Sequence, residues 1–202
     1  MKKFITLALA LCMALSASVC AYAAEIDTDG GSGSTPVYLS STEDGTMEGE
    51  PSATAMSVTV PNALPMAMSQ TGDVTTADNC QIINNSYGAV RVKSVTISAE
   101  NGWRLTAFGD KSTLASEKVD SNQLGFAICI GDGEWAVTDS SNESAQALIS
   151  APIDGCYMSG AGNTSGNTVS VDYSAIVTPL SAPVTNANIA NVVFVIEWDT
   201  AA

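Results

Sequence analysis

The sequence predicts an all-β protein: an antiparallel β-sandwich of about ten short strands with Greek-key or jelly-roll connections and little helix. Three observations predict this class. Short segments alternate apolar and polar residues, clusters of Gly, Asn, Asp and Ser separate these segments, and no long stretch shows the 3.6-residue period of a helix. We therefore expect a core of Val, Ile and Ala between two sheets.

The N-terminus has the features of a secretory leader. Lys2-Lys3 precedes an apolar run over residues 4–19 and the small-x-small sequence Ala21-Tyr22-Ala23, which predicts a signal peptide over residues 1–23. The residue before Cys20 is a valine, too large for a usual lipid-attachment site, and the run is too short for a membrane-spanning helix. We expect a protein that is secreted, extracellular or surface-associated, without membrane insertion after cleavage.

Residues 24–55 are rich in Gly, Ser and acidic residues, which predicts a flexible segment. Within it, residues 36–40 have the composition of a short strand, so Val37, Tyr38 and Leu39 are candidates for strand exchange. This strand either folds back onto its own domain or inserts into the sheet of a neighbouring molecule.

The predicted domain covers residues 56–202 and opens with strands over 56–61 and 80–84. Over 89–98 the apolar residues change parity between the first and second half of the strand. A strand cannot change its buried face without an additional residue, so we predict a β-bulge near Lys93-Ser94.

Asn101-Gly102 is a hairpin signal, and it predicts that residues 103–108 return as the partner of the preceding strand. Residues 110–121 are compatible with one or two helical turns or with a crossover loop. Residues 123–130 alternate as a strand, with Gly125, Ala127 and Cys129 on the face opposite its large apolar residues.

The C-terminal third contains the clearest strands. Residues 134–137 predict a short strand and residues 138–146 a loop. Residues 168–177 alternate apolar and polar throughout, which predicts a half-buried strand. Residues 192–198 are apolar on both faces at first, which predicts a central strand covered on both sides, with Trp198 in the core.

Charge and composition exclude several classes of function. After loss of the two leader lysines, five Lys or Arg remain against 21 Asp or Glu, a net charge of −16, which disfavours nucleic acid and anionic lipid as partners. The chain has no histidine, which removes Ser-His-Asp and Cys-His catalysis and His-liganded zinc. We expect no enzyme activity, no cofactor and no metal site.

Asp132 and Glu134 beside Trp135 form the most suggestive polar cluster. An aromatic ring next to carboxylates is a common way to grip a sugar, so this cluster is a candidate ligand site, and the two acids are also the one pair considered for glycoside hydrolysis. The alternative is an acidic hairpin with a partly buried Trp. Trp103 has the same two interpretations, as a ligand contact or as a core residue.

Cys80, Cys129 and Cys156 follow the predicted cleavage site. A disulfide is permitted outside the cell, and the pairing of these three residues stays open. A Cys129–Cys156 bridge is one expectation, and three buried free thiols are the other.

The step Gly102-Trp103-Arg104-Leu105, the opening Ser57-Val-Thr-Val-Pro61 and the closing Phe194-Val-Ile-Glu-Trp198 resemble the WxL-type domains of Gram-positive surface proteins. More loosely, the chain is similar to secreted β-sandwich matrix proteins of the TasA and camelysin kind. A second Trp-x-Leu is absent, because Asp199 and Thr200 follow Trp198. The resemblance implies an all-β surface protein without catalysis, bound non-covalently to peptidoglycan or to partner proteins.

Together these features predict a structural or adhesive protein of the cell surface or extracellular matrix. Its expected partners are cell-wall polymer, other surface proteins, or further copies of itself through strand addition. The alternative is a carbohydrate- or peptide-binding module that uses exposed Trp and acidic residues.

Overall fold

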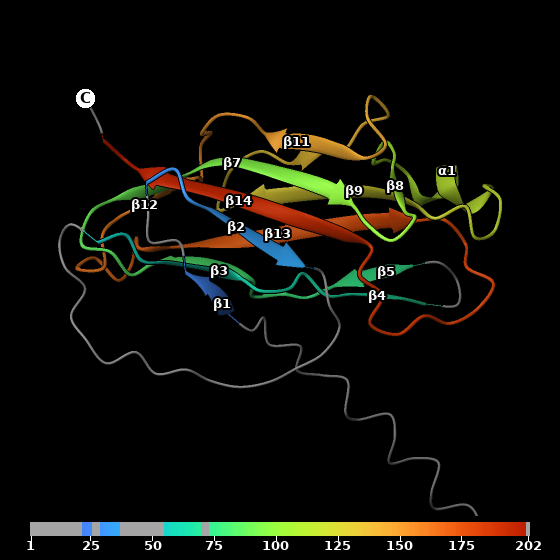
Figure 1. The fold of residues 1–202 in the computed structure, drawn as a ribbon, viewed down its shortest axis with the longest axis horizontal. Helices are drawn as coiled ribbons and strands as arrows, with labels where there is room; N and C mark the ends of the chain where they lie inside the picture. The colour runs from blue at the N-terminus through green and yellow to red at the C-terminus, as the bar shows by residue number, and fades with distance from the viewer. Residues whose placement is uncertain (1–21, 26–28, 37–54, 70–72, 201–202) are drawn as a thin grey trace, which may run out of the picture.

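The computed structural model describes residues 22–25, 29–36, 55–69 and 73–200, and the predicted signal peptide lies outside these ranges apart from its last two residues. The described chain forms a β-sandwich of two main sheets (Figure 1). Its strand pairs are antiparallel except one. The predicted fold class is therefore confirmed.

The larger sheet has seven strands. Along the sheet these are β1 (Tyr22–Glu25), β3 (Val58–Pro61), β6 (Gln81–Asn84), β13 (Thr168–Val177), β9 (Gln123–Ile130) and β10 (Ala136–Val137), with β8 (Arg104–Leu105) also paired to β9.

The smaller sheet has five strands. Along the sheet these are β11 (Ala145–Ile149), β7 (Val90–Ala99), β14 (Ala190–Trp198) and β2 (Ser32–Pro36), with β12 (Tyr157–Met158) also paired to β7. A hairpin of β4 (Met66–Met68) and β5 (Val74–Thr76) and one helical turn, α1 (Lys111–Ala115), lie outside the two sheets.

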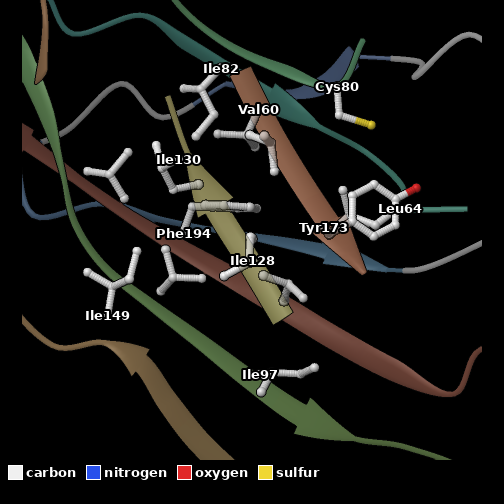
Figure 2. Close-up of a cluster of buried hydrophobic side chains, with 14 of the residues drawn as sticks. Val60, Leu64, Cys80, Ile82, Ile97, Ile128, Ile130, Ile149, Tyr173 and Phe194 are labelled. Carbon is white, nitrogen blue, oxygen red and sulfur yellow. The ribbon is translucent and has the colours of Figure 1, made fainter. Parts of the chain in front are cut away.

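Apolar side chains from both sheets interdigitate in one core (Figure 2). Ile128 and Ile130 project from the larger sheet, and Ile97 and Phe194 project from the smaller one; each is at most 1% exposed apart from none of the four. Burial of this apolar surface is the main favourable term in folding, at roughly 25 cal/mol per Å² removed from water.

The predicted β-bulge is present in β7. Val195 pairs with Ser94 and Ile196 pairs with Val92, so Lys93 is the additional residue. Because of this insertion, the valines before and after it all point into the core, and each is 0% exposed: Val90, Val92 and Val95.

Two expectations about strand pairing were wrong. The turn at Asn101-Gly102 forms, with φ of 51° and 82°, but the strand after it does not return along β7. Instead β8 crosses to the other sheet and pairs with β9 in parallel, Arg104 opposite Gln123. The turn signal specifies a reversal of the chain but not the sheet that the chain then joins.

Residues 110–121 contain a single helical turn, one of the two forms expected. The Asp110 side chain accepts a hydrogen bond from the Ser112 amide and caps the turn. Leu114, 5% exposed, covers part of the outer side of the larger sheet, where α1 packs on β13. The predicted loop over 138–146 was partly wrong, because β11 already begins at Ala145.

β14 is central, with β7 on one side and β2 on the other, but the residues on its second face are only partly buried. Trp198 is also only partly buried, and its ring lies against Gly88 at the rim of the core. The expectation that Trp198 is a core residue was therefore wrong, because the strand ends where the sandwich ends.

Tyr173 of β13 ties the β4–β5 hairpin to the body of the protein. Its hydroxyl donates to the Pro65 carbonyl at 2.6 Å and accepts from the Ala77 amide at 3.0 Å. Burial raises the pKa of Tyr173 to about 12, so this hydroxyl stays protonated and keeps its hydrogen bond.

Candidate interaction surfaces

The edge of β14 that carries β2 is the first candidate surface (Figure 1). β2 pairs antiparallel with β14 from Ser32 opposite Val195 to Pro36 opposite Asn191. The contact continues before β2, where the Ile196 amide donates to the Gly31 carbonyl and the Trp198 amide donates to an Asp29 carboxylate oxygen, both at 3.0 Å. The N-terminal segment thus completes the smaller sheet along most of β14.

This strand corrects the predicted layout of the N-terminal segment. A strand was expected over residues 36–40 and Gly/Ser-rich flexible chain before it, but the structure places β2 at Ser32–Pro36. Val37, Tyr38 and Leu39 lie outside the described residues. Sequence propensity missed β2 because a strand at a sheet edge is held by backbone hydrogen bonds, which Ser and Gly make as well as apolar residues do.

The other half of the N-terminal segment pairs with the larger sheet. In β1, Tyr22 lies opposite Pro61 and Glu25 lies opposite Thr59 of β3. β1 and β2 therefore close the same side of the sandwich, one on each sheet, and they also approach each other. Without them, both β3 and β14 would present unpaired backbone groups along an open edge.

Trp135 marks the second candidate surface, at the hairpin between β9 and β10. Its side chain is 53% exposed, and Val137 two residues later is 48% exposed on the same side of the strand. Asp132 and Glu134 are exposed in the same hairpin. The structure thus brings together three of the four residues expected to contact a ligand.

The turn below Trp135 is rigid because glycines allow its backbone to pack directly on another loop. A Cβ on Gly133 would lie 2.2 Å from the Asp154 carbonyl oxygen, and a Cβ on Gly155 would lie 2.1 Å from the Ile130 carbonyl oxygen. Neither position accepts a side chain without a shift of backbone. The fold therefore presents Trp135 on a fixed support.

Trp103 does not join this surface. It is half-buried against the core and precedes β8, which pairs with the beginning of β9, whereas Trp135 follows the end of β9. At about 3.3 Å per residue along β9, the two rings are on the order of 20 Å apart. Trp103 is a core residue of the β7–β8 turn, and its proposed share in the Trp135 site was wrong.

The expected Cys129–Cys156 disulfide is absent, and both thiols are free and buried. Cys156 lies in the core cluster, whereas Cys129 occupies the outer face of β9, opposite the residues that enter the core. The Cys129 sulfur lies 3.1 Å from the Gly133 carbonyl oxygen. Burial raises the pKa of both thiols, and the charges of Asp172 and Asp132 raise that of Cys129 further, so neither is a reactive thiolate at neutral pH.

Cys80 differs from these two residues. It is disulfide-bonded, although only 1% of it is exposed, and its side chain lies in the core beside the larger sheet (Figure 2). Since Cys129 and Cys156 are free, the partner of Cys80 is neither of them. Spacing along the sequence offered no signal for this outcome.

A basic cluster lies on the outer side of the smaller sheet. Glu197 of β14 accepts a hydrogen bond from Arg91 at 2.8 Å and lies 3.0 Å from the Lys93 ammonium, and Arg91 also lies 3.6 Å from Asp199. The hydrogen bond from Lys93, followed by that from Arg91, lowers the pKa of Glu197. Two of the five basic residues after the predicted leader are thus already neutralised by acids of this sheet.

Across the described ranges, no group of three or more His, Cys, Asp or Glu is arranged to hold a metal ion. The same residues include no helix of the length and apolarity needed to cross a membrane. Comparisons with protein-family models, with curated proteins and with solved structures found no match. The resemblance to WxL-type domains therefore stays a prediction from the sequence.

Proposed function

We propose that this is a secreted, non-catalytic protein of the cell surface or extracellular matrix, with a structural or adhesive role, whose copies associate by strand addition. It is held non-covalently, by cell-wall polymer or by partner proteins. The observation that carries the proposal is the pairing of β2 with β14: a strand of Ser, Gly, Thr and Pro completes the edge of a long apolar strand.

Exchange of β2 between copies costs little in contacts. The five residues of β2 contribute backbone hydrogen bonds and no large apolar side chain, so a β2 from another copy offers β14 the same partners. Residues 37–57 connect β2 to β3 and span roughly 70 Å when fully extended, which is enough to reach a neighbouring molecule. Insertion from one copy to the next does not close on itself, so it gives filaments.

A cross-link at this pairing tests the proposal. Ser34 lies opposite Val193, so the double variant Ser34→Cys/Val193→Cys forms a disulfide wherever β2 meets β14. With exchange, oxidation of the assembled protein gives a ladder of covalent multimers on a non-reducing gel, which dithiothreitol collapses to monomer. Ser34→Cys alone is the matched control and gives no ladder.

Two results would reject strand exchange. One is a covalent monomer as the sole oxidised product under conditions in which light scattering reports multimers. The other is persistence of filaments after deletion of residues 24–55. A protein that stays monomeric at every concentration would reject self-association as such.

The exposure of Trp135 on a rigid hairpin between Asp132 and Val137 supports a second candidate, a carbohydrate- or peptide-binding module. Under this alternative, Trp135→Ala lowers retention on cell-wall polysaccharide while the folded state persists. Val137→Ala, a similarly exposed residue of the same strand, is the control. If the unmodified protein is not retained by any polysaccharide, this candidate is rejected.

A further inference from the structure

The disulfide of Cys80 bears on where the chain is processed. Five cysteines occur in the sequence, and among those after the predicted leader Cys129 and Cys156 are free. The cysteines that remain are Cys12 and Cys20, both outside the described residues and both N-terminal to the Ala23–Ala24 bond. Cleavage at that bond would remove every remaining partner for Cys80 within the chain.

The register of the larger sheet brings the N-terminal segment toward Cys80. Tyr22 of β1 lies opposite Pro61, the last residue of β3, so the chain before Tyr22 extends beyond that end of β3. β6 is antiparallel to β3, with Ile83 opposite Thr59, so Cys80, just before β6, lies beyond the same end. Because β3 stops at Pro61, no strand of this sheet separates the two segments there.

The pairing of β1 supports the same conclusion. β1 comprises Tyr22–Glu25, and cleavage after Ala23 would divide it and remove the Tyr22–Pro61 pair. An earlier cleavage keeps the strand whole. The sequence Ser16-Ala17-Ser18 is a second small-x-small site, and the apolar run before it, residues 4–15, has the length of a signal-peptide core.

We propose that the leader is removed before Cys20, after Ser18, and that Cys20 forms the disulfide with Cys80 in the mature protein. The two thiols lose two protons and two electrons as the sulfur–sulfur bond forms. The acceptor is the disulfide of an extracytoplasmic thiol oxidoreductase, which is reduced to two thiols. The bridge anchors β1 to the larger sheet. The inference rests on secretion, part of the function proposed above.

Mass spectrometry of the full chain, expressed with its own leader and collected from the medium, tests both parts. We expect a first residue of Val19, two alkylatable thiols after unfolding without reductant, and four after reduction. The first Lys or Arg after Lys3 is Arg91, so trypsin leaves both cysteines in one peptide. A protease that cuts at Asp and Glu separates them and gives a linked pair of peptides that reductant splits.

Three outcomes would overturn the inference: a first residue of Ala24 with three alkylatable thiols, an acyl chain on Cys20, or a Cys80–Cys80 dimer. A chain found only inside the cell with Met1 intact would instead overturn secretion itself. The two failures are therefore distinguishable.

Cysteine variants give a second readout. Cys20→Ser and Cys80→Ser should each lower the melting temperature by on the order of 10 °C, and the double variant should lower it no further, since both remove one bond. Cys12→Ser is the matched control and should leave the melting temperature unchanged. Additive losses in the double variant would contradict the bridge.

Discussion

The two edges of β14 are paired in different ways. On one side, β7 pairs with all nine residues of β14, across a bulge that keeps the apolar side chains of β7 in the core. On the other side, β2 pairs with five residues of β14 and has the sequence Ser-Gly-Ser-Thr-Pro. Side-chain packing selects the partner at the first edge, and backbone hydrogen bonding alone holds the partner at the second. The second edge is therefore where exchange between molecules is expected.

Deletion of Lys93 is the strongest way to break this comparison. Without the bulge residue, one half of β7 turns its valines away from the core, and we expect a loss of more than about 4 kcal/mol in the free energy of unfolding or failure to fold. Urea denaturation followed by circular dichroism measures it. Lys93→Ala keeps the backbone and should cost no more than about 1 kcal/mol. A deletion variant as stable as Lys93→Ala would show that register is not locked at this edge.

Phe194→Ala tests the core side of β14 itself. Phe194 is 0% exposed between the sheets, so truncation leaves a cavity and should lower the free energy of unfolding by about 3–5 kcal/mol. Val193→Ala, on the partly exposed face of the same strand, should cost roughly 1 kcal/mol or less. Equal losses in the two variants would contradict the one-sided burial of β14.

The charge cluster at the β7 edge should make stability depend on pH. Its hydrogen bonds lower the pKa of Glu197 in the folded state, so its contribution is present above the unfolded pKa and is lost as pH falls through the folded pKa. Between about pH 5 and pH 3, the unmodified protein should lose more stability than Glu197→Gln, by less than about 1 kcal/mol because the cluster is near the surface. Parallel thermal melts measure this difference, and identical slopes would remove the contribution.

The smallest effect is expected at β2. Insertion of one Ser after Ser34 shifts the register of a strand that has no apolar face to misplace, so stability should change by only about 0.5 kcal/mol. Thermal denaturation of the insertion variant, beside the same insertion after Val95 in β7, measures the contrast. A large loss at β2 would mean that this edge is specified as tightly as the other.

The sequence predicted strands wherever an alternating pattern is long. Residues 123–130 and 168–177 form β9 and β13 over the ranges expected, and the parity change in 89–98 located the bulge at Lys93. Of the candidate ligand residues, Asp132, Glu134 and Trp135 do share one hairpin, because they are neighbours in the chain. Trp103 does not, because its position depends on which sheet the chain joins after a turn.

Local periodicity set the fold class, the main strands and the bulge, because the alternation of side chains along a strand is a property of a few consecutive residues. Tertiary structure alone decided that β8 joins β9, that β2 completes β14, and that Cys80 has a partner other than Cys129 or Cys156. Backbone hydrogen bonds are nearly the same for any sequence, so the pairing of distant segments is chosen by how the whole core packs.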